Sequence, residues 1–192
     1  VDVDKDGLSD VAKTKTLVIH PKLIYYINKN SNITLNYSGT FDQRTGGDMN
    51  HFKNTSIDTL YFVQSKSNRH NADLKFTSNL SSQDNLEIKA SANYLDQQIK
   101  NNHYNFGSDQ YIYFSEATLL HKSSKMDWVF GANFNGDRSI KKSSNLFPQL
   151  EDTDFTTLGA FVQTTFRPTA KLILESGFRF DYHKKYKDFL MP

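Results

Sequence analysis

The chain has 192 residues, of which 37% are hydrophobic and 14% aromatic, with a formal net charge of +2 and no cysteine. The aromatic content argues against a disordered chain, and the small charge with dispersed basic residues argues against nucleic acid as a partner. The lack of cysteine excludes a disulfide framework and a thiolate metal site.

The two ends of the chain carry no recognisable signal. The sequence opens at Val1 without an initiating Met or a leader, and it ends abruptly at Met191-Pro192. We therefore expect an internal fragment of a longer protein. No apolar run reaches the roughly 18 residues that a membrane-spanning helix requires, which excludes that element.

The first element in chain order is an acidic loop, residues 1–14. Its carboxylates alternate around a glycine, at Asp2, Asp4, Asp6 and Asp10. Carboxylate oxygens are preferred Ca²⁺ ligands and glycine permits the tight turn, so the pattern predicts a calcium-binding loop. The twelfth position is Lys13 rather than Glu and no helices flank the loop, which excludes an EF-hand. A solvated acidic turn is the alternative.

Residues 15–185 are predicted to form antiparallel hairpins, because apolar and polar side chains alternate with a period of two. This alternation places one set of side chains on each face of a sheet. We expect about eight strands, with a candidate interruption of the third near Asn68. The predicted strands are residues 16–28, 33–43, 60–80, 86–97, 109–122, 125–138, 154–167 and 170–183.

The two faces of the predicted sheet differ in charge. One face is nearly free of charge and carries Leu17, Leu35, Leu74, Ile88, Phe130 and Leu174. The other face is ionic and carries Lys22, Asp73, Lys75, Glu87, Lys89, Glu175, Arg179 and Asp181. Large aromatic residues lie mainly near strand ends, at Tyr25, Tyr37, Tyr94, Tyr111, Tyr113, Trp128 and Tyr182. An apolar lipid face, an ionic lumen and aromatic girdles are typical of a transmembrane β-barrel.

Short and long connections alternate along the chain. The long ones are predicted at residues 42–59, 97–109 and 135–154. Outer-membrane barrels show this asymmetry, and strands of about 10 to 14 residues exceed the 5 to 6 typical of soluble proteins. We predict an all-β fold, the partial wall of a transmembrane β-barrel with antiparallel up-and-down strands. A soluble β-sandwich, with a second sheet on the apolar face, is the alternative.

Polar residues in the predicted long connections are candidate ligand contacts. Arg44 and Asp48 belong to a glycine-containing turn, residues 44–49, which we expect at a loop tip. His51 and His103 fall in long connections and could contact a metal chelate. Ordinary turn chemistry is the alternative for Arg44 and Asp48, and a polar strand or loop histidine without a ligand is the alternative for His51 and His103. No catalytic motif is present, so neither an enzyme nor a cofactor other than calcium is predicted.

Three segments support each other by their order and spacing. They are DVDKDGLSDV at 2–11 before a strand, RTGGDM at 44–49 at the top of the second strand, and hairpins such as NRHN at 68–71 leading into DLKF at 73–76. In these features essentially the whole chain resembles the β-barrel of TonB-dependent outer-membrane receptors, particularly those of Bacteroidetes. A plug domain, a TonB-engaging segment and a closing strand are not recognisable, so the chain resembles an internal slice of the barrel.

The resemblance implies a place in the bacterial outer membrane and a part in uptake of a scarce nutrient, such as a metal chelate, a cobalamin or a glycan. It implies three partners: membrane lipid, the small nutrient, and the TonB complex acting through plug parts outside this chain. Two other functions stay open. One is a small eight-stranded outer-membrane barrel with an adhesin or structural role, and the other is a soluble β-sandwich binding module.

Overall fold

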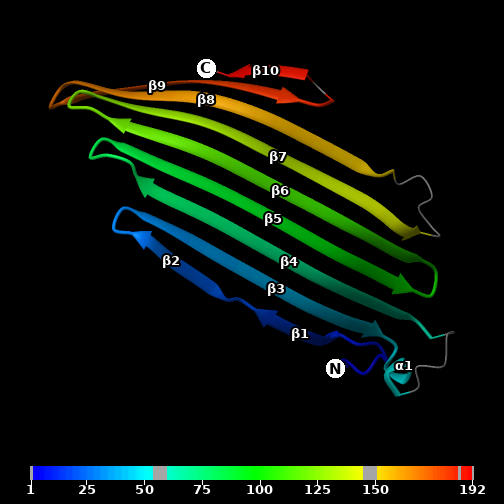
Figure 1. The fold of residues 1–192 in the computed structure, drawn as a ribbon. Helices are drawn as coiled ribbons and strands as arrows, with labels where there is room; N and C mark the ends of the chain where they lie inside the picture. The colour runs from blue at the N-terminus through cyan, green and yellow to red at the C-terminus, as the bar shows by residue number, and fades with distance from the viewer. Residues whose placement is uncertain (1, 54–59, 145–150, 186, 192) are drawn as a thin grey trace.

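The computed structural model describes residues 2–53, 60–144, 151–185 and 187–191. They form one antiparallel ten-stranded sheet in the order β1-β3-β4-β5-β6-β7-β8-β9-β10, with β2 also paired to β3 (Figure 1). The strands are β1 (Lys13–Ile19), β2 (Lys22–Asn28), β3 (Ser31–Gly47), β4 (Phe62–Asn79), β5 (Asp84–Asn101), β6 (Asn105–Lys122), β7 (Met126–Ser144), β8 (Thr153–Thr169), β9 (Leu172–His183) and β10 (Lys187–Met191).

One helix, α1 (Met49–Lys53), follows β3. Among the described residues, no helix has both the length and the apolar character needed to cross a membrane. From β3 to β10 each strand pairs with the next one in the chain. The predicted all-β, up-and-down wall is therefore confirmed.

The predicted first strand, residues 16–28, is divided into β1 and β2. Both segments pair with β3, Ile19 opposite Gly39 and Lys22 opposite Asn36, so the register continues across the break. The break falls at Pro21, which has no backbone N–H for the ladder. Its carbonyl still accepts a hydrogen bond from the Tyr37 amide at 3.1 Å. The division is a local effect of proline and leaves the face assignment intact.

The central strands are longer than predicted, with 17 residues in β3 and 18 in each of β4, β5 and β6. β4 passes Asn68 without the expected interruption. The predicted long connection at residues 97–109 was wrong, because Lys100 pairs with Asn105 in a tight hairpin. Apart from the cross-strand pair of Ile99 and Phe106, the side chains there are polar or small on both faces. Side-chain alternation is therefore weak, while backbone pairing, which is independent of side-chain polarity, continues.

The sheet is a single layer with little interior of its own. Phe62 is the one buried hydrophobic residue among those described, and none of them has a fully buried side chain. No second sheet covers the apolar face in the described part of the chain. The first strands do not pair with β10, and the sheet is open (Figure 1). This geometry fits neither the closed eight-stranded barrel nor the sandwich.

Candidate functional site

The apolar face contains an uncharged stretch in each long strand. In β5 the side chains on this face run without charge from Leu86 to Tyr94, between Asp84 and Asp96. The matching stretches are residues 111–119 in β6 and 128–136 in β7. These stretches are of about the 9 to 11 residues that a tilted strand needs to cross a bilayer.

Aromatic rings line the end of this uncharged band that lies nearest the long connections. Ring centroids are 6.1 Å apart for Tyr37 and His70, 6.1 Å for His70 and Tyr94, and 5.0 Å for Tyr94 and Tyr111. The Tyr37 hydroxyl also bonds His70 Nδ1 at 2.7 Å. Trp128 lies toward the opposite end, near the start of β7. The three tyrosines were predicted for the girdle, whereas the histidine between them was missed.

Ion pairs begin where the uncharged band stops. Lys142 contacts Asp109 at 2.7 Å and Asp96 at 3.1 Å, and these two hydrogen bonds, that to Asp109 first, raise the pKa of Lys142. At the other end, His121 Nδ1 lies 2.7 Å from Asp84, and hydrogen bonds from His121 and then Ser81 lower the Asp84 pKa. The Lys142 cluster was missed because residues 135–154 were predicted as a connection.

An ion pair at the short-connection edge of the sheet gives a pH prediction. Arg167 donates a 2.8 Å hydrogen bond to Asp127, which lowers the Asp127 pKa below its ordinary 3.8. A depressed folded-state pKa stabilises the protein above pH 3.8, and this contribution disappears as the pH falls through the folded-state value. Asp127→Asn should therefore destabilise the protein in chemical unfolding at neutral pH, with a difference that vanishes in acid. A difference that persists unchanged in acid would contradict this assignment.

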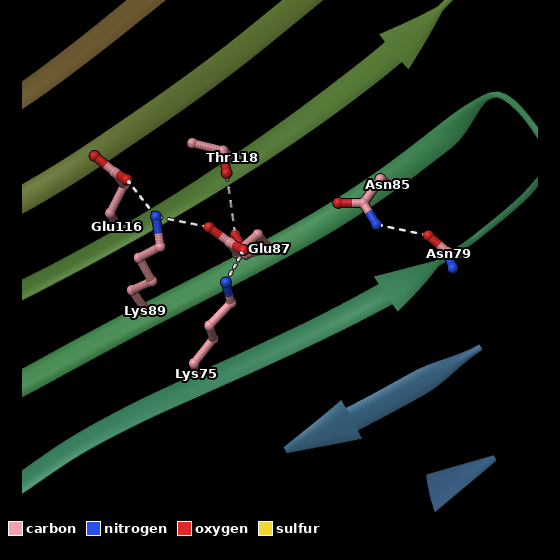
Figure 2. Close-up of polar contacts among 7 residues, drawn as sticks. All are labelled: Lys75, Asn79, Asn85, Glu87, Lys89, Glu116 and Thr118. Carbon is pink, nitrogen blue, oxygen red and sulfur yellow. Dashed lines mark hydrogen bonds and ion pairs between the residues drawn. The ribbon is translucent and has the colours of Figure 1, made fainter. Parts of the chain in front are cut away.

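The opposite face carries a chain of alternating charges across three strands (Figure 2). Lys75 in β4 lies 2.5 Å from Glu87 in β5, Glu87 lies 2.6 Å from Lys89, and Lys89 lies 3.8 Å from Glu116 in β6. Each acid thus has a cationic neighbour. Because the lysines are nearly half exposed, each pair contributes little to stability by itself. The prediction that Lys75, Glu87 and Lys89 share one ionic face is confirmed.

A second polar cluster on this face joins β7, β8 and β9. The Arg179 guanidinium donates two 2.7 Å hydrogen bonds to the Asp181 carboxylate and one of 3.3 Å to Asn133. Asp181 and Asn133 are each 6% exposed. Gly159 lies between them in the register, and a Cβ there would meet both side chains. Asn133 and Gly159 were missed because a single sequence does not reveal which residues face each other across strands.

The predicted acidic loop lies against the end of β3. The Ser9 amide donates to the Gly47 carbonyl at 2.9 Å, and the Met49 amide donates to the Gly7 carbonyl at 2.8 Å. Carboxylate oxygens of three of its predicted residues lie within 4.8 Å of one another: Asp2, Asp4 and Asp10. Asp2 Oδ1 is buried without a hydrogen-bond partner. Asp6 is outside this group and accepts a 2.7 Å bond from the Leu8 amide.

Calcium binding by this loop stays a prediction. If Asp2, Asp4 and Asp10 supply the ligands, Asp10→Asn should weaken Ca²⁺ binding by tenfold or more, roughly the effect of losing one charged ligand. Asp6→Asn is the matched control and should weaken it less. Calorimetric titration of the full-length protein measures both. Equal effects of the two variants, or no binding heat at millimolar Ca²⁺, would contradict the ligand set.

The four predicted ligand residues do not form one cluster. Arg44 lies within β3, not at a loop tip, and pairs with Asp42 at 2.7 Å. Asp48 precedes α1, where its carboxylate accepts a 2.7 Å bond from the Asn50 amide as a helix cap. His51 is 8% exposed and stacks on Phe62 with ring centroids 4.6 Å apart.

His103, the fourth predicted residue, is exposed in the tight turn between β5 and β6. Its amide donates to Asn101 Oδ1 at 2.8 Å. Contact of any of the four with a nutrient stays a prediction. Asp48 and His51 have structural roles in holding α1, whereas Arg44 and His103 are exposed and available to a ligand.

Solved structures share this fold. The chain superposes on the copper transporter OprC with a TM-score of 0.64 and 14% identity, over 90% of this chain and 29% of that one. For the ferric-catecholate import receptor Fiu from E. coli K12 the TM-score is 0.67 at 12% identity, over 93% and 38%. For the RagAB peptide importer it is 0.67 at 11%, over 93% and 29%. The chain thus spans well under half of these proteins.

No curated protein matches the chain. A family model does match it, over residues 20–190, and is described as TonB dependent receptor-like, beta-barrel. This match includes both the uncharged band and the ionic clusters. The chain belongs to the TonB-dependent receptor-like β-barrel family and forms a partial barrel wall.

Proposed function

We propose that this wall belongs to an outer-membrane transporter that takes up a scarce nutrient with energy delivered by TonB. In the proposed orientation of the wall, the apolar face contacts lipid and the ionic face lines the lumen. The TonB complex would act through plug parts outside this chain. The family match and the likeness to importers support the proposal.

The observation that carries the membrane orientation is the drift of the uncharged band across the sheet. Its centre lies near Pro21 in the first strands, near Ala90 in β5 and near Phe178 in β9. Relative to the pairing register, this is a shift of about six residues over about seven strand steps. With about 3.3 Å per residue and 4.8 Å between strands, the band is tilted by roughly 30° to the perpendicular of the strands.

Strands of membrane barrels tilt by about 35–45° from the membrane normal, so the membrane plane is inclined by the same angle to the perpendicular of the strands. The roughly 30° tilt of the uncharged band is close to this value. A soluble sandwich has no reason to shift its apolar band across the sheet in one direction. The drift therefore favours one flat hydrocarbon slab across the whole wall. The ionic face suits the lumen, because water in the lumen hydrates its partly exposed charges.

The nutrient belongs to a class that such receptors carry, and we propose a metal chelate, a cobalamin or a glycan. Each is too large or too polar to cross lipid unaided. The peptide importer among the similar structures adds a short peptide as a further candidate. The exposed Arg44 and His103 are the residues of this chain that we propose for first contact with it.

The test is uptake by cells that lack the gene. Loss of the gene should abolish accumulation of one labelled nutrient, and the intact gene should restore it. An uncoupler that dissipates the proton gradient should reduce uptake to the level of the deletion. Unchanged uptake of all four classes in the deletion strain would refute a transport role for the protein.

A further inference from the structure

We propose that the lipid-facing surface of β1, β3 and β4 holds one phosphorylated membrane lipid, its headgroup between Lys15 and Lys66. The inference rests on the proposed orientation of the apolar face. It concerns the outside of the wall, away from the lumen.

The cationic part of this site lies just beyond the uncharged band. Lys15 and Lys66 are both exposed and both pair with Gln43, from opposite sides in the register. Lys13 lies on the same face one side-chain position further along β1. Within the described part of the chain, no ion pair joins any of these lysines to a carboxylate. The like charges are therefore available to an anion.

The nearest acid in β3 faces the other way. Asp42 accepts hydrogen bonds from Thr16 at 2.5 Å and from Arg44 at 2.7 Å on the ionic face. These bonds, that from Thr16 first, lower its pKa. By contrast, Lys142 on the same outer surface is held between two aspartates. Among the residues that the structure describes, the outer-face lysines of β1 and β4 thus lack a neighbouring carboxylate partner, whereas Lys142 has two.

Two adjoining hollows are lined by these lysines. One, of about 360 Å³, is lined by Lys15, Leu17, Phe41 and Lys66 of the outer face, and Thr16, Asp42, Gln43 and Asn68 complete its lining. The other, of about 200 Å³, is lined by Lys13, Lys15 and His51. His51 is 8% exposed and its Nδ1 is buried without a hydrogen-bond partner. Basic pockets beside the hydrocarbon region bind anionic lipid head groups, and this pair of hollows supplies the cations for one.

The same surface continues into an apolar hollow deeper in the band. It has a volume of about 480 Å³ and is walled by Leu23, Leu35, Tyr37 and Leu74, with the small Ala72, Ala90 and Ala92 at its floor. Pro21 lines this hollow and lies roughly 20 Å along the strand from Lys15. Because the strands are tilted, this separation projects onto the membrane normal as about half of a 30 Å hydrocarbon core, which is the depth of one leaflet. An acyl chain can therefore lie in the hollow while its phosphate reaches the lysines.

The experiment distinguishes a lipid from free phosphate, because the acyl chains of a lipid should contribute to its binding. The purified full receptor in non-ionic detergent is titrated with phosphatidic acid, and bound lipid is counted by native mass spectrometry. Lys15→Gln/Lys66→Gln should weaken binding by about 10- to 30-fold, since each lysine near an anionic lipid contributes about a factor of five. Lys125→Gln/Lys171→Gln removes the same charge at exposed turn positions that line neither hollow, and it should bind as the native protein does. Diacylglycerol, with the same tails and no phosphate, should not be retained.

Ala90→Leu probes the tail hollow without altering charge, and should also weaken lipid binding. Native-like binding by the double lysine variant would overturn the proposal. Displacement of the lipid by inorganic phosphate would overturn it too, in favour of a site for soluble anions. Nutrient uptake by the lysine variant should stay normal. A failed lipid site is thereby distinguished from a failed transport role.

Discussion

Replacing Ala90 by arginine should destabilise the full receptor in lipid by about 2–4 kcal/mol, because it places a charge at the middle of the lipid-facing band. Ala90 pairs with Leu74 on one side and with Ser115 on the other. All three positions are uncharged and belong to the apolar face. The free energy of unfolding, measured by urea titration in vesicles, gives the effect.

Ser91→Arg is the matched control for this change. Ser91 is the next residue of β5 and pairs with Asp73 on the ionic face. Its arginine would be hydrated in the lumen beside a carboxylate, so we expect a change below about 1 kcal/mol. Equal destabilisation by the two variants would contradict the assignment of the faces.

Gly47→Ala should destabilise the receptor by about 1–3 kcal/mol, whereas Gly46→Ala should be nearly neutral. Gly47 has a φ of 131°, a backbone conformation that residues with a Cβ rarely adopt. A Cβ at this position would also meet the Tyr61 carbonyl oxygen and, at 2.6 Å, the Phe62 Cα. Both are backbone atoms that a rotamer change does not move away.

At Gly46 an added Cβ meets Ser9 Oγ at 3.4 Å and Ala12 Cβ at 3.7 Å, which are ordinary contacts. The comparison between the two glycines is read from thermal unfolding of the full receptor. Because Gly47 also exchanges hydrogen bonds with Ser9, the alanine variant should loosen the acidic loop as well. Equal melting temperatures for both variants would show that the turn tolerates a side chain at Gly47.

The faces of the wall were predictable because alternation within one strand needs no knowledge of its neighbours. Leu35, Leu74 and Ile88 fall on the apolar face, and Lys75, Glu87 and Lys89 on the ionic face, as predicted. Strand ends were less predictable. Beyond Gln97 one apolar residue, Ile99, is left among polar ones, so the pattern loses contrast although the ladder continues to Asn101.

The polar clusters required cross-strand register. Asn133, Gly159 and Asp181 are neighbours because of how β7, β8 and β9 align, and no local signal relates them. In the glycine-containing turn predicted at residues 44–49, positive φ is found at Gly47 and not at Gly46, and no local signal distinguishes the two. The break at Pro21 had a local signal, the missing donor of proline, that the strong alternation around it concealed.

The measurement that tests the central claim most directly uses single cysteines, since the chain contains none of its own. Spin labels are placed in turn at Ala90, Ser91, Ala92 and Asn93 of the full receptor in vesicles, with any cysteines outside this chain removed. We predict that collision rates alternate. Labels at 90 and 92 should contact oxygen dissolved in the lipid, and labels at 91 and 93 should contact a water-soluble nickel chelate. Uniform exposure of all four labels to the chelate would contradict a wall with one face in the membrane.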